Sequence, residues 1–166
     1  MTCLIIILLF LAVPFISFGK ETYNEICADA AQLFGLNEDE YRVEFLKNVV
    51  NASGRPVDSL FNYDDYNVKT IYTIQVKKTI SRALTIGNIF HEFAHAAQHK
   101  YNMDFGGYTR EQHAEMLAFN TLWKSTYQWN AVHMLTLHSF RAKPSDYLVT
   151  KEVWDIALTS KVYASV

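Results

Sequence analysis

Hydrophobic and polar residues follow two different periods along the chain, and each period predicts a type of element. From 21 to 34 the apolar residues recur at helical spacing, and Gly35 stands where helices commonly end, so we predict a helix over 21–34. The segment from Tyr41 to Phe45 alternates apolar and polar residues, which is typical of a strand with one buried face. Residues 53–56 predict a turn, whereas 68–80 is rich in β-branched and aromatic residues and predicts a second strand.

The period becomes helical after Ser81, which we expect to cap a helix over 83–100. Thr109 and Gln112 have the spacing of a capping box and predict the start of another helix, which extends to about Trp129. Two more helices are predicted, over 130–141 and 145–162. The order of elements predicts an α+β fold, in which a short antiparallel sheet packs on the helix at 83–100 and further helices lie C-terminal to it.

The first twenty residues differ in composition from the rest of the chain. Leu4–Phe18 is an almost unbroken apolar run, shorter than the ~20 residues that span a hydrocarbon core. Small residues at Ser17 and Gly19 favour cleavage by a signal peptidase after Gly19. We therefore expect a signal peptide over 1–19, a single domain over 20–166, and a secreted or periplasmic protein. No Lys or Arg precedes the apolar run, which leaves an uncleaved anchor or a short buried helix as the alternative.

Charge and cysteine content narrow the range of partners. The formal net charge is −2, from 15 basic and 17 acidic side chains, and neither sign gathers into a long run. Nucleic acid is therefore excluded as a partner, and so is a membrane surface once the signal has been cleaved. Cleavage leaves Cys27 as the single cysteine, so the secreted domain has no internal disulfide, and the helical setting of Cys27 favours a packing role.

His91, Glu92 and His95 form the pattern HExxH inside the helix predicted over 83–100. Four residues make about one helical turn, so both imidazoles project from the same side and lie near enough to bind one zinc ion. Glu92 is rotated by about 100° from the first histidine and stands beside the ligands, where it can accept a proton from an attacking water. The spacing predicts two zinc ligands and a general base.

A helical wheel separates these histidines from the apolar stripe of the same helix. His91 and His95 lie at about 140° and 180° from Ile86 on the wheel, facing away from the stripe. The stripe lies within about 60° of that reference and consists of Ile86, Ile89, Phe90, Phe93 and Ala97. This division favours a helix that lines a cleft, although histidines at helical spacing also occur on solvated faces or as hydrogen-bonded core residues.

A catalytic zinc ion usually has three protein ligands, and the helix that begins at Thr109 offers Glu111, His113 and Glu115. Glu115 is the preferred third ligand, because a carboxylate among apolar residues is costly unless a cation compensates its charge. Glu111 lies one turn earlier on the same face and is the alternative, as the ligand or as a partner of a ligating histidine. His113 is rotated by about 160° from Glu115 and cannot serve together with it.

The segment 68–129 resembles the gluzincin branch of the zincin metallopeptidases. The resemblance rests on the HExxH sequence and on a pattern in the following helix, formed by Glu115, Ala118 and Phe119. It implies a small zincin-like domain, in which the strand at 68–80 lines the cleft and binds an extended peptide. It also implies that the two histidines and Glu115 hold the zinc ion. Ala114 departs from the larger thermolysin-like enzymes, which have asparagine before that glutamate.

These features predict a secreted zinc metallopeptidase that hydrolyses a peptide or protein substrate, with Glu92 as the general base. Two alternatives stay open: a secreted binding or inhibitor module with a non-catalytic HExxH, and a zinc hydrolase that acts on peptidoglycan peptides. The oligomeric state is not predicted. Four residues are candidates for stabilising the oxyanion, without a preference among them: Tyr101, Tyr108, His133 and His138.

Overall fold

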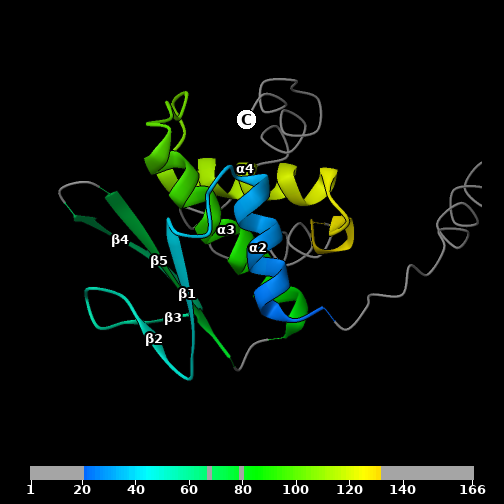
Figure 1. Cartoon of the computed structure of the whole chain (residues 1–166), viewed down its shortest axis with the longest axis horizontal. Coiled ribbons are helices and arrows are strands. Elements are labelled where there is room, and N and C mark those ends of the chain that lie inside the picture. The colour runs from blue at the N-terminus through cyan, green and yellow to red at the C-terminus, as the bar shows by residue number, and fades with distance from the viewer. Residues whose placement is uncertain (1–20, 67–68, 79–80, 132–166) are drawn as a thin grey trace, which may run out of the picture.

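A computed structural model describes residues 21–66, 69–78 and 81–131 of the chain (Figure 1). The predicted signal peptide and the two predicted C-terminal helices, apart from residues 130 and 131, lie outside this part. The described elements are α2 (Tyr23–Leu33), β1 (Tyr41–Leu46), β2 (Val49–Val50), β3 (Pro56–Val57), β4 (Ser59–Tyr66), β5 (Lys69–Lys77), α3 (Arg82–Lys100) and α4 (Arg110–Lys124). The predicted α+β class is confirmed, and so are the helix at 21–34, the helix at 83–100 and both predicted strands.

The main sheet has three strands in the order β1-β5-β4. β4 pairs with β5 in the antiparallel sense, whereas β1 pairs with β5 in the parallel sense. The prediction of an antiparallel sheet is therefore wrong for one of its two pairings. The cause is β4, which lies in a segment for which no element was predicted. The strand direction reverses from β1 to β4 and again from β4 to β5, so β1 and β5 run parallel.

One face of this sheet carries the apolar side chains. Val43 of β1 aligns with Ile74 of β5, and Ile74 aligns in turn with Phe61 of β4. Because side chains alternate between faces, residues two positions away share this face with them. In β5 these residues, Tyr72, Ile74 and Val76, are buried, while the intervening residues are only half-buried. Within the described residues, the sheet is thus buried mainly on one face.

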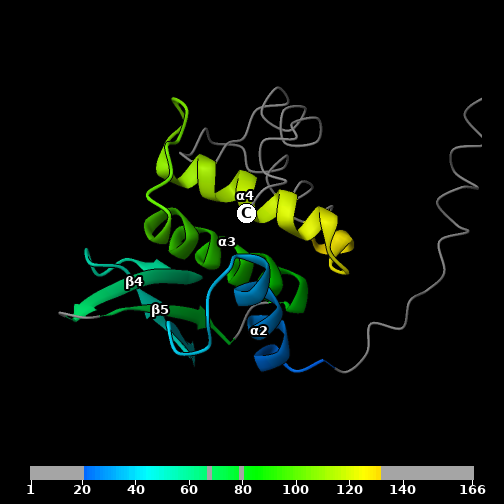
Figure 2. The ribbon, with the colours of Figure 1, turned by 45° about the horizontal axis from the view of Figure 1, so that its top comes forward.

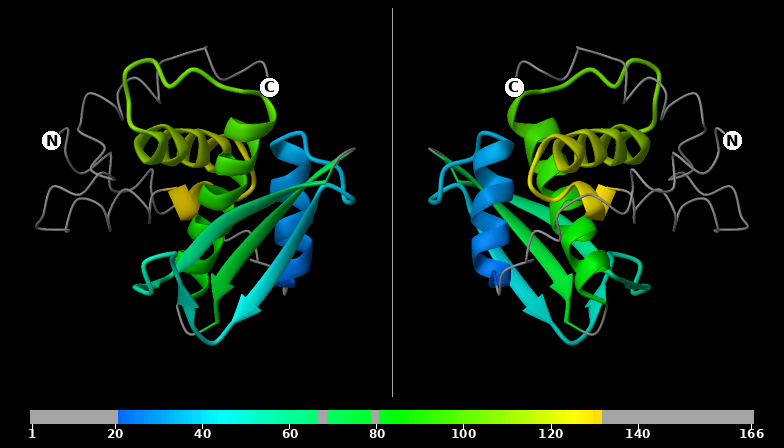
Figure 3. Two further views of the ribbon diagram at one scale, coloured as in Figure 1. Left: turned by 90° about the vertical axis from the view of Figure 1, so that its left-hand side faces the viewer. Right: turned by 90° about the vertical axis from the view of Figure 1, so that its right-hand side faces the viewer.

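Three layers follow from this one-sided sheet. α2 and α3 cover the apolar face, and α4 packs on the far side of α3, so that α3 is enclosed between β4–β5 and α4 (Figures 2 and 3). Contacts between aromatic rings join α2 to its neighbours: Tyr23 stacks on Phe45 of β1, and Phe34 meets Phe90 of α3 edge to face. α3 is therefore the central element of the described fold.

α2 supplies much of the remaining core. Its N-terminus has a capping box between Thr22 and Glu25, and after its C-terminus Gly35 adopts a φ of +68°. Cys27 is buried in this helix, as its setting in the sequence suggested, and burial raises the pKa of its thiol to about 12. The thiol is therefore a core group and is protonated at neutral pH.

The ends of α3 and α4 are set by local capping. Ser81 accepts a hydrogen bond from the Leu84 amide, and Thr109 with Gln112 forms the predicted capping box. α4 ends at Lys124, earlier than predicted, because Ser125 has an extended backbone. Among the described residues, no helix combines the length and the hydrophobicity that a membrane span requires.

Candidate metal centre

His91 and His95 project from consecutive turns of α3 and direct the same ring atom at one carboxylate. His91 Nε2 lies 3.2 Å from Glu111 Oε2, and His95 Nε2 lies 3.1 Å from the same oxygen. The two rings meet edge to face, with their centroids 4.7 Å apart. Glu111 comes from the first turn of α4, so the packing of α4 on α3 completes a cluster that the HExxH sequence begins.

The Nδ1 atom of each histidine faces a hydrogen-bond acceptor on the other side of its ring. His91 Nδ1 lies 2.8 Å from Glu115 Oε2, and His95 Nδ1 lies 2.8 Å from Gln98 Oε1. Both Nδ1 atoms therefore donate a proton, so Nε2 of each ring is the nitrogen that faces Glu111 and that a metal can bind once it is deprotonated. Ligating histidines are commonly held in this way, through the nitrogen that does not bind the metal.

Electrostatics couple the carboxylates to His91. Burial acts to lower the pKa of His91, but its hydrogen bonds to Glu111 and Glu115 outweigh burial and hold that pKa well above its usual value of 6.5. Burial acts to raise the pKa of Glu111, yet the hydrogen bonds from both histidines keep it well below its usual value of 4.5. The hydrogen bonds therefore favour a protonated, positively charged His91 beside an ionised Glu111.

The donor set fits a zinc ion. Two imidazole nitrogens and one carboxylate oxygen, from His91, His95 and Glu111, lie within 4.8 Å of one another, and these are ligand types that zinc prefers. With neutral rings, three lone pairs converge, an arrangement that a proton or a metal cation must compensate. The side chains of His91 and His95 are only 10% and 6% exposed, whereas the Glu111 side chain is 34% exposed. Solvent therefore reaches the cluster from the side of Glu111.

The acidic residue in this cluster is Glu111, the alternative in the sequence-based ranking, and not the preferred Glu115. Glu115 is 3% exposed, and its carboxylate faces His91 Nδ1, the ring nitrogen that points away from Glu111. In this position it orients the ring. The Glu115 carboxylate, for which the sequence analysis expected a compensating cation, faces His91 and helps to raise the pKa of that ring. His113 is also buried and faces Gln98.

Glu92 is buried next to His91 and receives a hydrogen bond from β4. Ser59 Oγ donates to Glu92 Oε1 over 2.6 Å. Sequence reasoning missed Ser59, because β4 itself was not predicted. The alternation of Ser59, Phe61 and Tyr63 was the available signal, but the acidic and amide residues around it are uncommon in strands.

The oxyanion candidates have different surroundings. Tyr101 donates its hydroxyl hydrogen bond to the Gly35 carbonyl, 3.1 Å away, and Tyr108 is half-buried against the core. The other two, His133 and His138, lie outside the described residues. The ring of His99, one turn beyond His95, lies tilted against Tyr63, and its Nδ1 lies 3.3 Å from the Tyr72 hydroxyl. His99 is thus separate from the cluster around Glu111.

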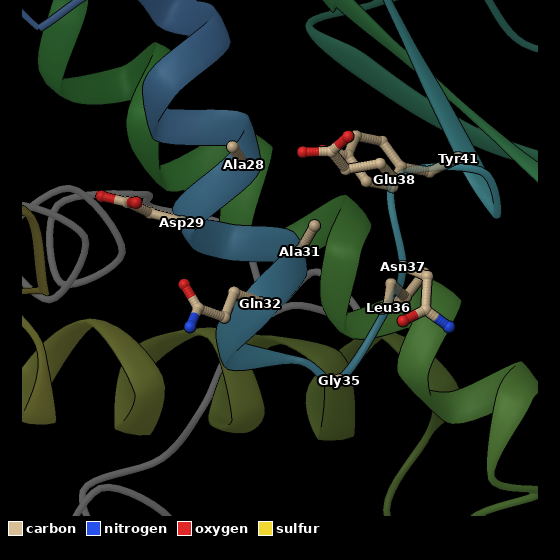
Figure 4. Close-up of a pocket in the computed structure, with 9 residues that line it drawn as sticks. All are labelled: Ala28, Asp29, Ala31, Gln32, Gly35, Leu36, Asn37, Glu38 and Tyr41. Carbon is tan, nitrogen blue, oxygen red and sulfur yellow. The ribbon is translucent and has the colours of Figure 1, made fainter.

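A separate hollow lies between α2 and the loop that leads to β1 (Figure 4). Its lining includes Gln32, Asn37 and Glu38, and it contains none of the cluster residues.

Comparison of the chain with protein-family models, curated proteins and solved structures gives no significant match. The functional argument therefore rests on the chemistry of the cluster itself.

Proposed function

We propose that this chain is a zinc metallopeptidase of the compact gluzincin-like type, secreted after removal of residues 1–19. The observation that carries the proposal is the convergence of His91 Nε2 and His95 Nε2 on Glu111 Oε2, with both Nδ1 atoms held by acceptors. Two histidines and one carboxylate are a common ligand set of catalytic zinc, which keeps a further position for water or substrate. The third ligand in this proposal is Glu111.

The residues around the cluster have distinct roles in peptide hydrolysis. Zinc, when bound, supplies a Lewis acid that polarises a carbonyl and activates water. Glu92 accepts the proton of the attacking water and later delivers it to the leaving nitrogen. Ser59 holds one oxygen of Glu92, which leaves the other available for the proton. Glu115 and Gln98 fix the rings of His91 and His95.

In this proposal an extended peptide substrate binds along the edge of β4. The resemblance to gluzincins implied that 68–80 binds an extended peptide, but β5 is paired on both sides. In the described part of the chain β4 pairs only with β5, and the side chains of Ser59 and Phe61 contact Glu92 and His95. An extended peptide that adds to this edge passes beside Glu92.

Zinc content and peptide cleavage, measured on the same preparations, test the proposal. The variants are Glu111→Ala, Glu92→Gln and, as a control, Glu38→Ala, which changes an exposed loop glutamate. We expect about one zinc per chain in the wild type and the control, none in Glu111→Ala, and retained zinc in Glu92→Gln with cleavage reduced roughly 10²- to 10⁴-fold. Cleavage is followed by mass spectrometry on a mixed peptide library.

The other outcomes separate the alternatives. A wild type that binds no stoichiometric zinc, even after reconstitution, contradicts the proposal. A wild type that binds zinc but cleaves neither the library nor peptidoglycan peptides supports a secreted binding module. If the wild type cleaves peptidoglycan peptides alone, the proposed metal centre stands and the substrate class is peptidoglycan in place of protein.

A further inference from the structure

Gln98 lies on α3, almost one turn after His95, and all its polar atoms face partners inside the protein. The side chain is 3% exposed. Its Oε1 lies 2.8 Å from His95 Nδ1, and its Nε2 lies 2.9 Å from both the Arg110 carbonyl oxygen and His113 Nδ1. One amide therefore joins a candidate metal ligand on α3 to two groups on α4.

The Arg110 carbonyl determines which way this amide points. A carbonyl oxygen only accepts hydrogen bonds, so the NH₂ group of Gln98 must face it, and Oε1 must face His95. Since Oε1 only accepts, His95 Nδ1 donates to it, and Nε2, which faces Glu111, is the ring nitrogen that can bind a metal once it is deprotonated. The second N–H of Gln98 points at His113 Nδ1, which accepts it. Each link fixes the hydrogen-bonding direction of the next.

We infer that Gln98 is a positioning residue, which holds His95 in the tautomer that binds a metal through Nε2 and ties that ring to the start of α4. His113 supports it by accepting the second N–H of the amide. Because Glu111 follows Arg110 directly, the same amide also fixes the segment that carries the carboxylate of the cluster. The metal-binding part of this inference rests on the proposed function, whereas the tautomer of His95 does not.

The two histidines are consequently held by different chemistry. His91 donates to the carboxylate of Glu115, and His95 donates to a neutral amide. A carboxylate partner makes an imidazole more basic, whereas an amide orients the ring without adding charge. The neutral partner limits the negative charge in a cluster that already contains Glu92, Glu111 and Glu115.

The test uses Gln98→Met, which keeps the length of the side chain and removes its hydrogen bonds. The control is Gln75→Met, which removes the hydrogen bond of a half-buried glutamine to Glu44 in the sheet. The tautomer of His95 is read by nitrogen-detected NMR of the metal-free full-length chain, in mildly alkaline buffer, so that a neutral ring reports its state. Zinc affinity is measured by competition with a chelator.

We expect the wild type and Gln75→Met to hold His95 with its proton on Nδ1. In Gln98→Met this preference is lost and zinc affinity falls roughly 10- to 100-fold. Gln98→Glu restores an acceptor for His95 Nδ1 but loses the donor to the Arg110 carbonyl, so it should restore the His95 tautomer and only part of the affinity, a separation that a purely structural effect of residue 98 would not produce. Thermal unfolding of each variant shows whether it is folded.

The inference is overturned by a wild-type His95 that carries its proton on Nε2, or by a Gln98→Met variant with an unchanged tautomer and affinity. If the wild type binds no zinc, the proposed function fails, but the tautomers of the metal-free wild type and Gln98→Met still decide the role of Gln98. The two failures are therefore distinguishable.

Discussion

Ser59 donates a 2.6 Å hydrogen bond to Glu92, joining the first residue of β4 to the acidic residue of the HExxH sequence. The contact begins a regular series in which Phe61 lies against His95 and Tyr63 against His99. Two residues of a strand advance by about 6.6 Å, and three to four residues of a helix by about 4.5–6 Å, so the elements stay in step. β4 therefore runs alongside the side of α3 that carries the histidines.

Ser59→Ala is expected to reduce peptide cleavage roughly fivefold and to leave zinc content unchanged. The reason is the loss of one hydrogen bond, worth about 1 kcal/mol, that orients Glu92 for proton transfer. Steady-state kinetics and metal analysis on the same samples check this result. Ser53→Ala, in the exposed hairpin turn, is the matched control, and a cleavage rate for Ser59→Ala equal to that of the control would refute the role of Ser59.

Glu111→Ala and Glu115→Gln are expected to differ in zinc affinity. Removal of Glu111 deletes a ligand and abolishes measurable zinc binding, whereas Glu115→Gln keeps an acceptor for His91 Nδ1 and weakens binding by no more than roughly 10- to 100-fold. Chelator competition provides both values. The opposite result, with zinc binding lost only in Glu115→Gln, would contradict Glu111 as the third ligand. It would favour Glu115, the ligand preferred from the sequence.

The stability of the metal-free protein is expected to be greatest between about pH 4.5 and 6.5, because the ion pair between His91 and Glu111 is fully charged there in the folded and unfolded chain. The raised pKa of His91 contributes stability below 6.5, and this contribution is lost as the pH rises through the folded value. The lowered pKa of Glu111 contributes stability above 4.5, and this contribution is lost as the pH falls through the folded value.

Thermal unfolding across this pH range, with and without zinc, measures the effect. Zinc requires the deprotonated form of His91, so added zinc should stabilise the protein more as the pH rises. His91→Gln is the control and should flatten the alkaline side of the metal-free profile. A metal-free protein that gains stability from pH 6.5 upward would contradict the assigned pKa direction of His91.

Local sequence signals predicted the helices well. The capping box of Thr109 and Gln112, the cap at Ser81 and the glycine after α2 all act within a few residues, so their geometry follows from the sequence nearby. The wheel also separated the apolar stripe of α3 from its histidines, although both sides of the helix are buried. It did not predict that α4 and β4 cover the histidine side, because that depends on how the elements pack.

The parts that sequence did not predict depend on contacts between distant elements. β4 has the acidic residues Asp64 and Asp65 near its end. Because such polar residues are uncommon in strands, the alternation of Ser59, Phe61 and Tyr63 did not lead to the prediction of a strand. Without β4, the parallel pairing of β1 with β5 could not be predicted. The choice between Glu111 and Glu115 likewise depends on the distance between α3 and α4, since both residues lie on the same face of α4.

Gly35→Ala is expected to destabilise the fold more than Gly54→Ala. Both glycines have a positive φ, of +68° and +73°, so alanine costs about 1 kcal/mol in backbone strain at either position. At Gly35 an added Cβ also meets the hydroxyl of Tyr101, whereas nothing lies near it at Gly54. Chemical denaturation measures both variants. Tyr101→Phe should recover part of the extra loss at Gly35, and equal losses for both glycines would contradict the close contact.

The most direct test of the metal centre is the position of a zinc ion in crystals of the zinc-loaded full-length chain, located by anomalous scattering at the zinc edge. The account predicts one peak about 2.0–2.2 Å from the Nε2 atoms of His91 and His95 and from a carboxylate oxygen of Glu111. Glu115 should stay on His91 Nδ1. The absence of a peak between these residues, or a peak bound by Glu115 with Glu111 turned away, would contradict it.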